Sequence, residues 1–105
     1  MATPDLKQLM AQAQEMQKRM QEMQAQLAKT EVIGEAGGGL VKIIMTCSHE
    51  VRKILIAEEA WKEDREILEG LIIAAFNDAI RKAEKTSKER ISALSKEMGL
   101  PESLG

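Results

Sequence analysis

The sequence of 105 residues is short of aromatic side chains and of cysteine. Its rings are Trp61 and Phe76 alone, without a tyrosine, and its one cysteine is Cys47. A single cysteine excludes an internal disulfide framework and fits a reducing compartment. The shortage of rings argues against modules that bind single-stranded nucleic acid by stacking bases on exposed aromatic side chains.

Long apolar runs are missing as well. No stretch approaches the roughly 20 apolar residues that a membrane-spanning helix needs, and the N-terminus has neither the basic nor the apolar region of a signal peptide. We therefore expect a cytoplasmic protein without a membrane partner. With 44% hydrophobic and 30% charged residues, the composition is typical of a globular protein, and the length allows one domain.

Catalytic and metal-binding motifs are also missing. The glycines 37–39 are not followed by the Lys-Ser/Thr pair of a phosphate-binding loop and lead into a predicted strand, which favours a turn. Cys47 and His49 lie close in sequence, but no second pair completes a zinc site. His49 is the only histidine, and no nucleophile has a partner base. The sequence therefore predicts no enzyme activity, no metal and no cofactor.

The net charge of -2 hides an uneven distribution along the chain. Residues 31–80 hold five basic and ten acidic side chains, whereas residues 81–96 hold six basic and two acidic ones, a local balance of +4. Residues 1–30 carry four basic and three acidic side chains. A protein of this charge binds nucleic acid only through local patches, and residues 81–96 are the strongest. The alternative interpretation of this segment is an ordinary solvated helix face.

The first 30 residues predict one long helix that reaches about Lys29. Thr3, Pro4 and Asp5 have the pattern of an N-cap, a first-turn proline and a carboxylate at the positive end of the helix dipole. A helix of about 25 residues is roughly 38 Å long, more than the diameter of about 30–35 Å of a compact domain of this size. We therefore expect it to project or to lie along a partner.

Apolar residues recur in this helix at alternating spacings of three and four, which is a heptad seam. Its members are Leu6, Leu9, Ala13, Met16, Met20, Met23 and Leu27. A narrow seam of this kind favours another helix as its cover. The methionines are interpreted as ordinary packing residues or, alternatively, as an adaptable groove that binds other proteins.

Between residues 30 and 56 the sequence changes to glycines and β-branched residues. Residues 31–35, 40–47 and 51–56 predict three strands, and their short connections require antiparallel neighbours in a three-stranded meander. Both faces of the second strand are partly apolar. One chain of this length covers one of them, so a second copy of the chain is expected to cover the other in a dimer. The acidic residues 58–64 predict a loop or short turn.

A second long helix is predicted from about Asp64 to Met98, ahead of Gly99 and Pro101. Its first part has an apolar stripe suited to packing on the sheet, whereas the part beyond Ala83 is basic and is expected to project into solvent. The side chains on the arc opposite the stripe are Arg81, Lys85, Lys88 and Lys96.

Several motifs follow one another along the chain in a recognisable order. They are a Met/Gln-rich first helix, Gly37-Gly38-Gly39-Leu40-Val41-Lys42, His49-Glu50-Val51, Ala74-Ala75-Phe76-Asn77-Asp78-Ala79 and Arg81-Lys82-Ala83-Glu84. From about Leu6 to Pro101 the chain thereby resembles the YbaB/EbfC family of small bacterial nucleoid-associated proteins. One departure is the stretch 57–61, where the family often has an Asp-Pro-like turn. It affects the shape of a loop.

The resemblance implies an α+β fold with an αβββα subunit, a tweezer-like homodimer, a nucleoid location and DNA binding without a cofactor. We thus expect one domain, residues 1–105, with a projecting helix (1–30), a sheet and dimer core (31–83), and a basic helix end and tail (84–105).

The predicted function is that of a homodimeric, nucleoid-associated protein that contacts the backbone of double-stranded DNA with little sequence specificity and serves nucleoid organisation and gene regulation. The candidate DNA-contacting residues are Lys18, Arg19, Arg81, Lys85, Lys88 and Arg90. The candidate residues for dimer or seam packing are Leu9, Met16, Met20, Met23, Val41, Ile43 and Phe76. The alternative function is a coiled-coil adaptor or chaperone-like module that holds protein partners with its Met-rich helix.

Overall fold

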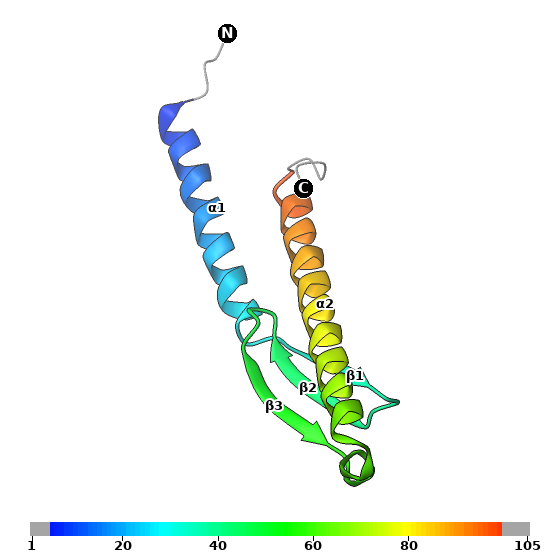
Figure 1. The fold of residues 1–105 in the computed structure, drawn as a ribbon. Helices are drawn as coiled ribbons and strands as arrows, with labels where there is room; N and C mark the ends of the chain where they lie inside the picture. The colour runs from blue at the N-terminus through cyan, green and yellow to red at the C-terminus, as the bar shows by residue number, and fades with distance from the viewer. Residues whose placement is uncertain (1–4, 100–105) are drawn as a thin grey trace.

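The computed structural model describes residues 5–99 and has the element order α–β–β–β–α (Figure 1). The elements are helix α1 (Leu6–Leu27), strands β1 (Glu31–Ala36), β2 (Val41–Thr46) and β3 (Val51–Ile56), the short 3-10 helix η1 (Glu58–Lys62) and helix α2 (Arg65–Glu97). The strands form one antiparallel sheet with β2 in its centre. The predicted α+β class, the three-stranded meander and the two long helices are confirmed.

The start of α1 differs from the prediction for a local reason. Its N-cap is Asp5, whose carboxylate accepts a hydrogen bond of 3.2 Å from the backbone nitrogen of Lys7. The prediction that Thr3 caps this helix is therefore wrong. Thr3 and Pro4 themselves lie outside the described residues.

Helix α2 covers one face of the sheet. Val41 and Ile43 of β2 point to this face and have no exposed surface. Three alanines of α2 pack against them, spaced one helical turn apart and fully buried: Ala75, Ala79 and Ala83. Small side chains at this spacing let the helix backbone approach the strands closely.

Glycine in β1 makes the closest approach between helix and sheet. Gly34 pairs with Ile43 in the register of β1 and β2 and is itself buried. A Cβ atom at Gly34 would overlap the carbonyl oxygen of Ala75 and the backbone nitrogen of Ala79. The absence of a side chain at this position therefore sets the distance of α2 from the sheet.

Two side chains of α2 close the outer edge of β1. The Asp78 carboxylate accepts a hydrogen bond of 2.9 Å from the Glu35 backbone nitrogen, and Lys82 Nζ donates one of 2.9 Å to the Ile33 carbonyl oxygen. Asp78 and Lys82 also form an ion pair at 2.9 Å. The hydrogen bond from Glu35, followed by that from Lys82, lowers the pKa of Asp78 below its ordinary value. At the opposite edge, five of the six residues of β3 are exposed.

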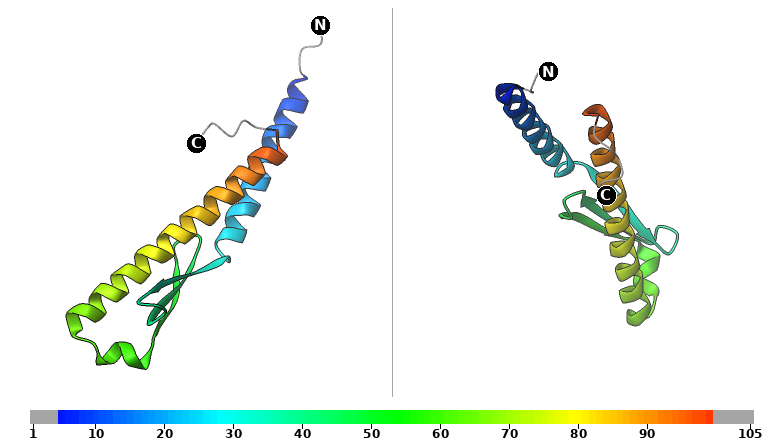
Figure 2. Two further views of the ribbon diagram at one scale, coloured as in Figure 1. Left: turned by 90° about the vertical axis from the view of Figure 1, so that its right-hand side faces the viewer. Right: turned by 90° about the horizontal axis from the view of Figure 1, so that it is seen from above.

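Helix α1 is attached at its C-terminal end and leaves the body of the protein at the other. Met23 and Leu27 form a second buried cluster with Cys47, against which Leu94 of α2 packs. The radius of gyration is 20.0 Å, against about 13 Å for a compact domain of 100 residues. Both helices extend to the same side of the sheet (Figures 1 and 2). The part of α2 beyond Ala83, which was expected to project into solvent, packs through Leu94 against the cluster at the base of α1.

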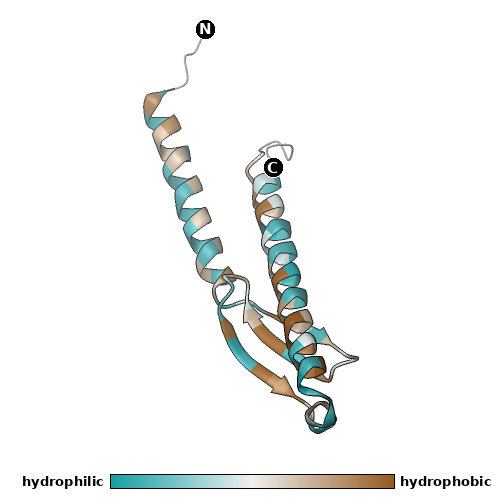
Figure 3. Cartoon of the chain, viewed as in Figure 1, coloured by the Kyte–Doolittle hydropathy of each residue, from teal (hydrophilic) through white to brown (hydrophobic). Residues whose placement is uncertain are grey.

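Apolar residues gather on the strands and on the half of α2 beside them, whereas polar residues dominate the projecting parts of both helices (Figure 3). Within residues 5–99, neither helix combines the length and the apolar character needed to cross a membrane.

Candidate nucleic-acid interface

The basic residues predicted to contact DNA lie on two separate surfaces. An α-helix turns by about 100° per residue, so Arg81, Lys85 and Lys88 of α2 share one face about 60° wide. Arg90 is turned by roughly 140° from Lys85. It lines a cleft of about 450 Å³ between α1 and α2, together with Lys18 of α1. We name the first surface the outer face and the second the inter-helix cleft.

The outer face presents cations with few partners. All three of its side chains are exposed. Arg81 lies 3.9 Å from the Asp78 carboxylate, which is already held by Lys82 at 2.9 Å. The side chains of Lys85 and Lys88 form no hydrogen bond or ion pair with any other residue in the range 5–99. Exposed cations without a carboxylate partner are available to phosphate oxygens.

The inter-helix cleft balances its charges internally. Its cations are Lys18, Arg19 and Arg90, and its anions are Glu15, Glu22 and Glu97. Arg19 lies 3.2 Å from Glu15 on its own helix and 3.4 Å from Glu97 on α2. The floor between them is apolar, with Met23 and Leu94. The cleft thus holds three of the six predicted DNA contacts beside an equal number of carboxylates.

The predicted packing residues lie in three places. Val41 and Ile43 are buried within the protomer beneath α2, and Phe76 of α2 is half-buried beside them. Met20 and Met23 belong to the cluster at the base of α1. Farther along the same seam, Met16 is half-buried and Leu9 is 47% exposed. The part of the seam at Met20 and Met23 therefore packs against its own chain, whereas the part at Leu9 does not.

Cys47 is a structural residue of the second cluster. It is 5% exposed, and burial raises the pKa of its thiol, which the nearby Arg90 charge and a hydrogen bond with Thr86 partly offset. The Ser87 hydroxyl donates a hydrogen bond of 3.4 Å to the Cys47 carbonyl oxygen. In the described part of the chain, no three His, Cys, Asp or Glu side chains gather in a way that could hold a metal ion.

Asp78 and Lys82 were not singled out from the sequence, although they tie α2 to the edge of β1. The available signal was their spacing of four, which places an acid and a base on one helix face. That spacing indicates an ion pair on the helix. It contains no information about the strand edge that both side chains reach.

Comparisons with known proteins concern the family and the fold of the chain. The model of the YbaB/EbfC DNA-binding family matches residues 1–98. The structure is similar to the crystal structure of the uncharacterized protein HP0035 from Helicobacter pylori, with a TM-score of 0.71 and 22% sequence identity. The likeness covers 83% of this chain and 92% of that one. At this identity it establishes the shared fold of two helices around a three-stranded sheet.

Proposed function

Because the chain belongs to the YbaB/EbfC DNA-binding family, we propose that it acts as a homodimer and holds duplex DNA by the phosphate backbone, with the outer face of α2 as the contact surface. The observation that carries this proposal is the difference between the two basic surfaces. Lys85 and Lys88 are exposed and without partners within residues 5–99, whereas the cations of the inter-helix cleft stand among carboxylates.

The dimer is proposed to form on the uncovered part of the sheet. Ile33 and Leu55 are turned to the face that α2 does not cover, and they are 47% and 40% exposed. Ile54 and Val51 on β3 are 44% and 39% exposed. Ile54 and Val51 pair with Ile43 and Met45, so they lie on the other face of the sheet, and β3 therefore exposes apolar side chains on both of its faces. Exposed apolar surface on an edge strand is typical of an interaction site. A second copy placed there buries the apolar side chains and the open edge of β3, and it leaves the outer face of α2 free.

Binding of this type carries little sequence information. Ammonium and guanidinium groups on phosphate oxygens position a protein on the duplex but do not distinguish bases. The outer face offers Arg81, Lys85 and Lys88 rather than the Asn, Gln and Arg set with which a recognition helix reads base edges. A role in organising the nucleoid, with effects on many genes, follows from such binding.

The proposal is tested by two double variants with the same change of charge. Lys85→Glu/Lys88→Glu reverses the outer face, and Lys18→Glu/Arg90→Glu reverses two cations of the inter-helix cleft. We expect the first variant to lose retention on duplex DNA at low salt and the second to keep most of it. Circular dichroism and light scattering establish that both variants are folded and of unchanged mass. Equal losses would assign the effect to net charge and overturn the outer face as the site.

A further inference from the structure

The outer half of α1 keeps its apolar seam uncovered. Leu6 and Leu9 are 69% and 47% exposed, and Met10 beside them is 56% exposed, whereas Met23 and Leu27 on the same seam are 8% and 7% exposed. The heptad spacing continues unbroken from the covered half into the uncovered half. The uncovered half therefore has the pattern of a helix-packing surface that residues 5–99 of the same chain leave largely exposed.

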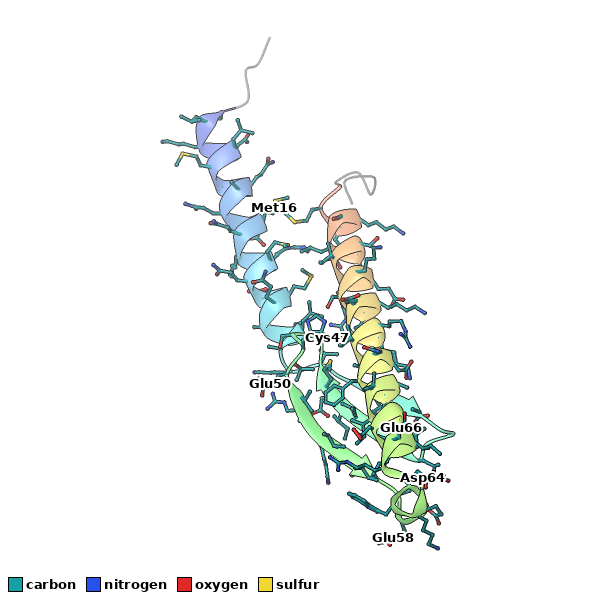
Figure 4. All side chains as sticks on the ribbon, in the orientation of Figure 1. Met16, Cys47, Glu50, Glu58, Asp64 and Glu66 are labelled. Carbon is teal, nitrogen blue, oxygen red and sulfur yellow. The ribbon has the colours of Figure 1, made fainter. Side chains whose placement is uncertain are left out.

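A shallow groove lies along this half of the seam. Leu9, Ala13 and Met16 of α1 form one wall, and Met98 at the end of α2 forms the other, around a volume of about 420 Å³. Among the described residues of the lining, Gln12 is the only polar one. Figure 4 shows Met16 pointing from α1 toward the end of α2. An apolar groove beside a heptad seam has the shape that accepts a further helix.

The residues that flank the seam favour an identical helix as the occupant. In two-helix coiled coils, the charges at the flanking e and g positions determine which partner is accepted. With Leu6 and Leu9 at the a and d positions, the flanking e and g positions of the outer half are Asp5, Met10, Gln12 and Gln17. Asp5 is the only charged one and lies at the end of the segment, so two copies of this segment meet without like charges directly opposite one another. A partner selected by charge would find few charged side chains to contact here.

We propose that the outer half of α1 packs on the same segment of another dimer and links dimers bound to DNA. The inference rests on the proposed function for the sheet-based dimer, which leaves the α1 tips free because α1 projects away from the sheet (Figure 1). A segment of about 11 residues makes a weak coiled coil by itself. The contact is therefore populated when dimers are concentrated along the same duplex, where the effective concentration is high.

The test uses the full chain with one introduced thiol, because the native Cys47 is buried. Ala13→Cys places the thiol on the seam, and Ala11→Cys places it on the opposite side of the same exposed helix turn. On duplex DNA under a mild oxidant, we expect Ala13→Cys to form disulfide-linked pairs of chains at least tenfold faster than Ala11→Cys. Light scattering after the DNA is removed is then expected to report a particle of at least tetramer mass, in which the disulfide joins two dimers. Equal rates, or a cross-linked particle that remains a dimer, would overturn the inference.

A second pair of variants separates this inference from the proposed function. Leu6→Ser/Leu9→Ser is expected to abolish assemblies larger than a dimer on long DNA and to leave the affinity for a short duplex, which holds one dimer, within about twofold of the parent. Ala11→Ser is the matched control and changes neither. Seam variants that still form the larger assemblies would refute the linkage. Loss of short-duplex binding in Lys85→Glu/Lys88→Glu reports on the outer face alone.

Discussion

The substitution Gly34→Ala tests the packing of α2 on the sheet. A Cβ atom at this position overlaps the Ala75 carbonyl oxygen, the Ala79 nitrogen and the Ala79 Cβ. Two of these atoms belong to helix backbone, which cannot turn aside as a flexible side chain does. Relief requires α2 to move away from β1 and β2, and that movement disturbs the buried alanine contacts together with the hydrogen bonds of Asp78 and Lys82.

The expected cost follows from these contacts. Overpacking a close-packed site costs about 1–3 kcal/mol, and each hydrogen bond that is stretched adds about 0.5–1.5 kcal/mol. We therefore expect Gly34→Ala to lower the free energy of unfolding by about 3 kcal/mol. For a domain of this size, that corresponds to a fall in Tm of about 12–24 °C, measured by circular dichroism at a fixed protein concentration.

Gly70→Ala is the matched control, with the same atoms added and the opposite expected sign. Gly70 lies within α2, and apart from its own helix backbone no atom lies within 4 Å of an added Cβ. Alanine is favoured over glycine inside a helix by about 1 kcal/mol, so this variant is expected to melt about 4–8 °C higher. If Gly34→Ala melts within about 3 °C of the parent, α2 does not lie on β1 as described and the reasoning is refuted.

Two further predictions concern titratable groups. Asp78→Asn removes the charge from the contacts with Glu35 and Lys82 and is expected to lower stability at pH 7 by about 1–2 kcal/mol. Folding lowers the pKa of Asp78, so ionised Asp78 stabilises the parent above the ordinary carboxyl pKa, and this contribution is lost as pH falls through the lowered value. Urea unfolding from pH 7 to pH 3 is therefore expected to narrow the difference in stability between parent and variant, and a constant difference would contradict the assignment. Cys47 is buried with a raised pKa, so a thiol reagent at pH 8 is expected to label it at least tenfold more slowly in the native protein than in denaturant, and equal rates would show that the second cluster is open.

The elements of the fold were predictable because their signals are local. The spacing of apolar residues in α1 and α2 has the helical period, and the glycines 37–39 interrupt it before a β-branched segment. Gly37, Gly38 and Gly39 all have positive φ angles in the structure, as a tight turn between antiparallel strands requires. The length of α1 does not decide its placement, because its 22 residues span about 33 Å, close to the diameter of a compact domain of this size; the buried cluster at its C-terminal end does.

The arrangement of the candidate site depends on tertiary placement, which the sequence patterns do not contain. Arg90 and Lys88 are close in sequence, but only the position of α1 decides that Arg90 enters the inter-helix cleft with Glu97. Thr46 is a polar residue at the end of β2, yet it has no exposed surface. Its hydroxyl lies 2.9 Å from the Ser48 hydroxyl and accepts a bond of 3.1 Å from the Glu50 nitrogen, which satisfies its polar atom inside the turn.

The most direct test of the central claim is the salt dependence of DNA affinity, measured by fluorescence anisotropy on a short duplex between about 50 and 200 mM salt. Three phosphate contacts from each outer face give six for a dimer, and a slope of log K against log salt near about -5. We expect Lys85→Ala/Lys88→Ala, which removes four of them, to reduce the slope to about -2. Lys18→Ala/Arg90→Ala is expected to leave it unchanged. An unchanged slope in the Lys85→Ala/Lys88→Ala variant would contradict the assignment of the outer face of α2 as the phosphate-binding surface.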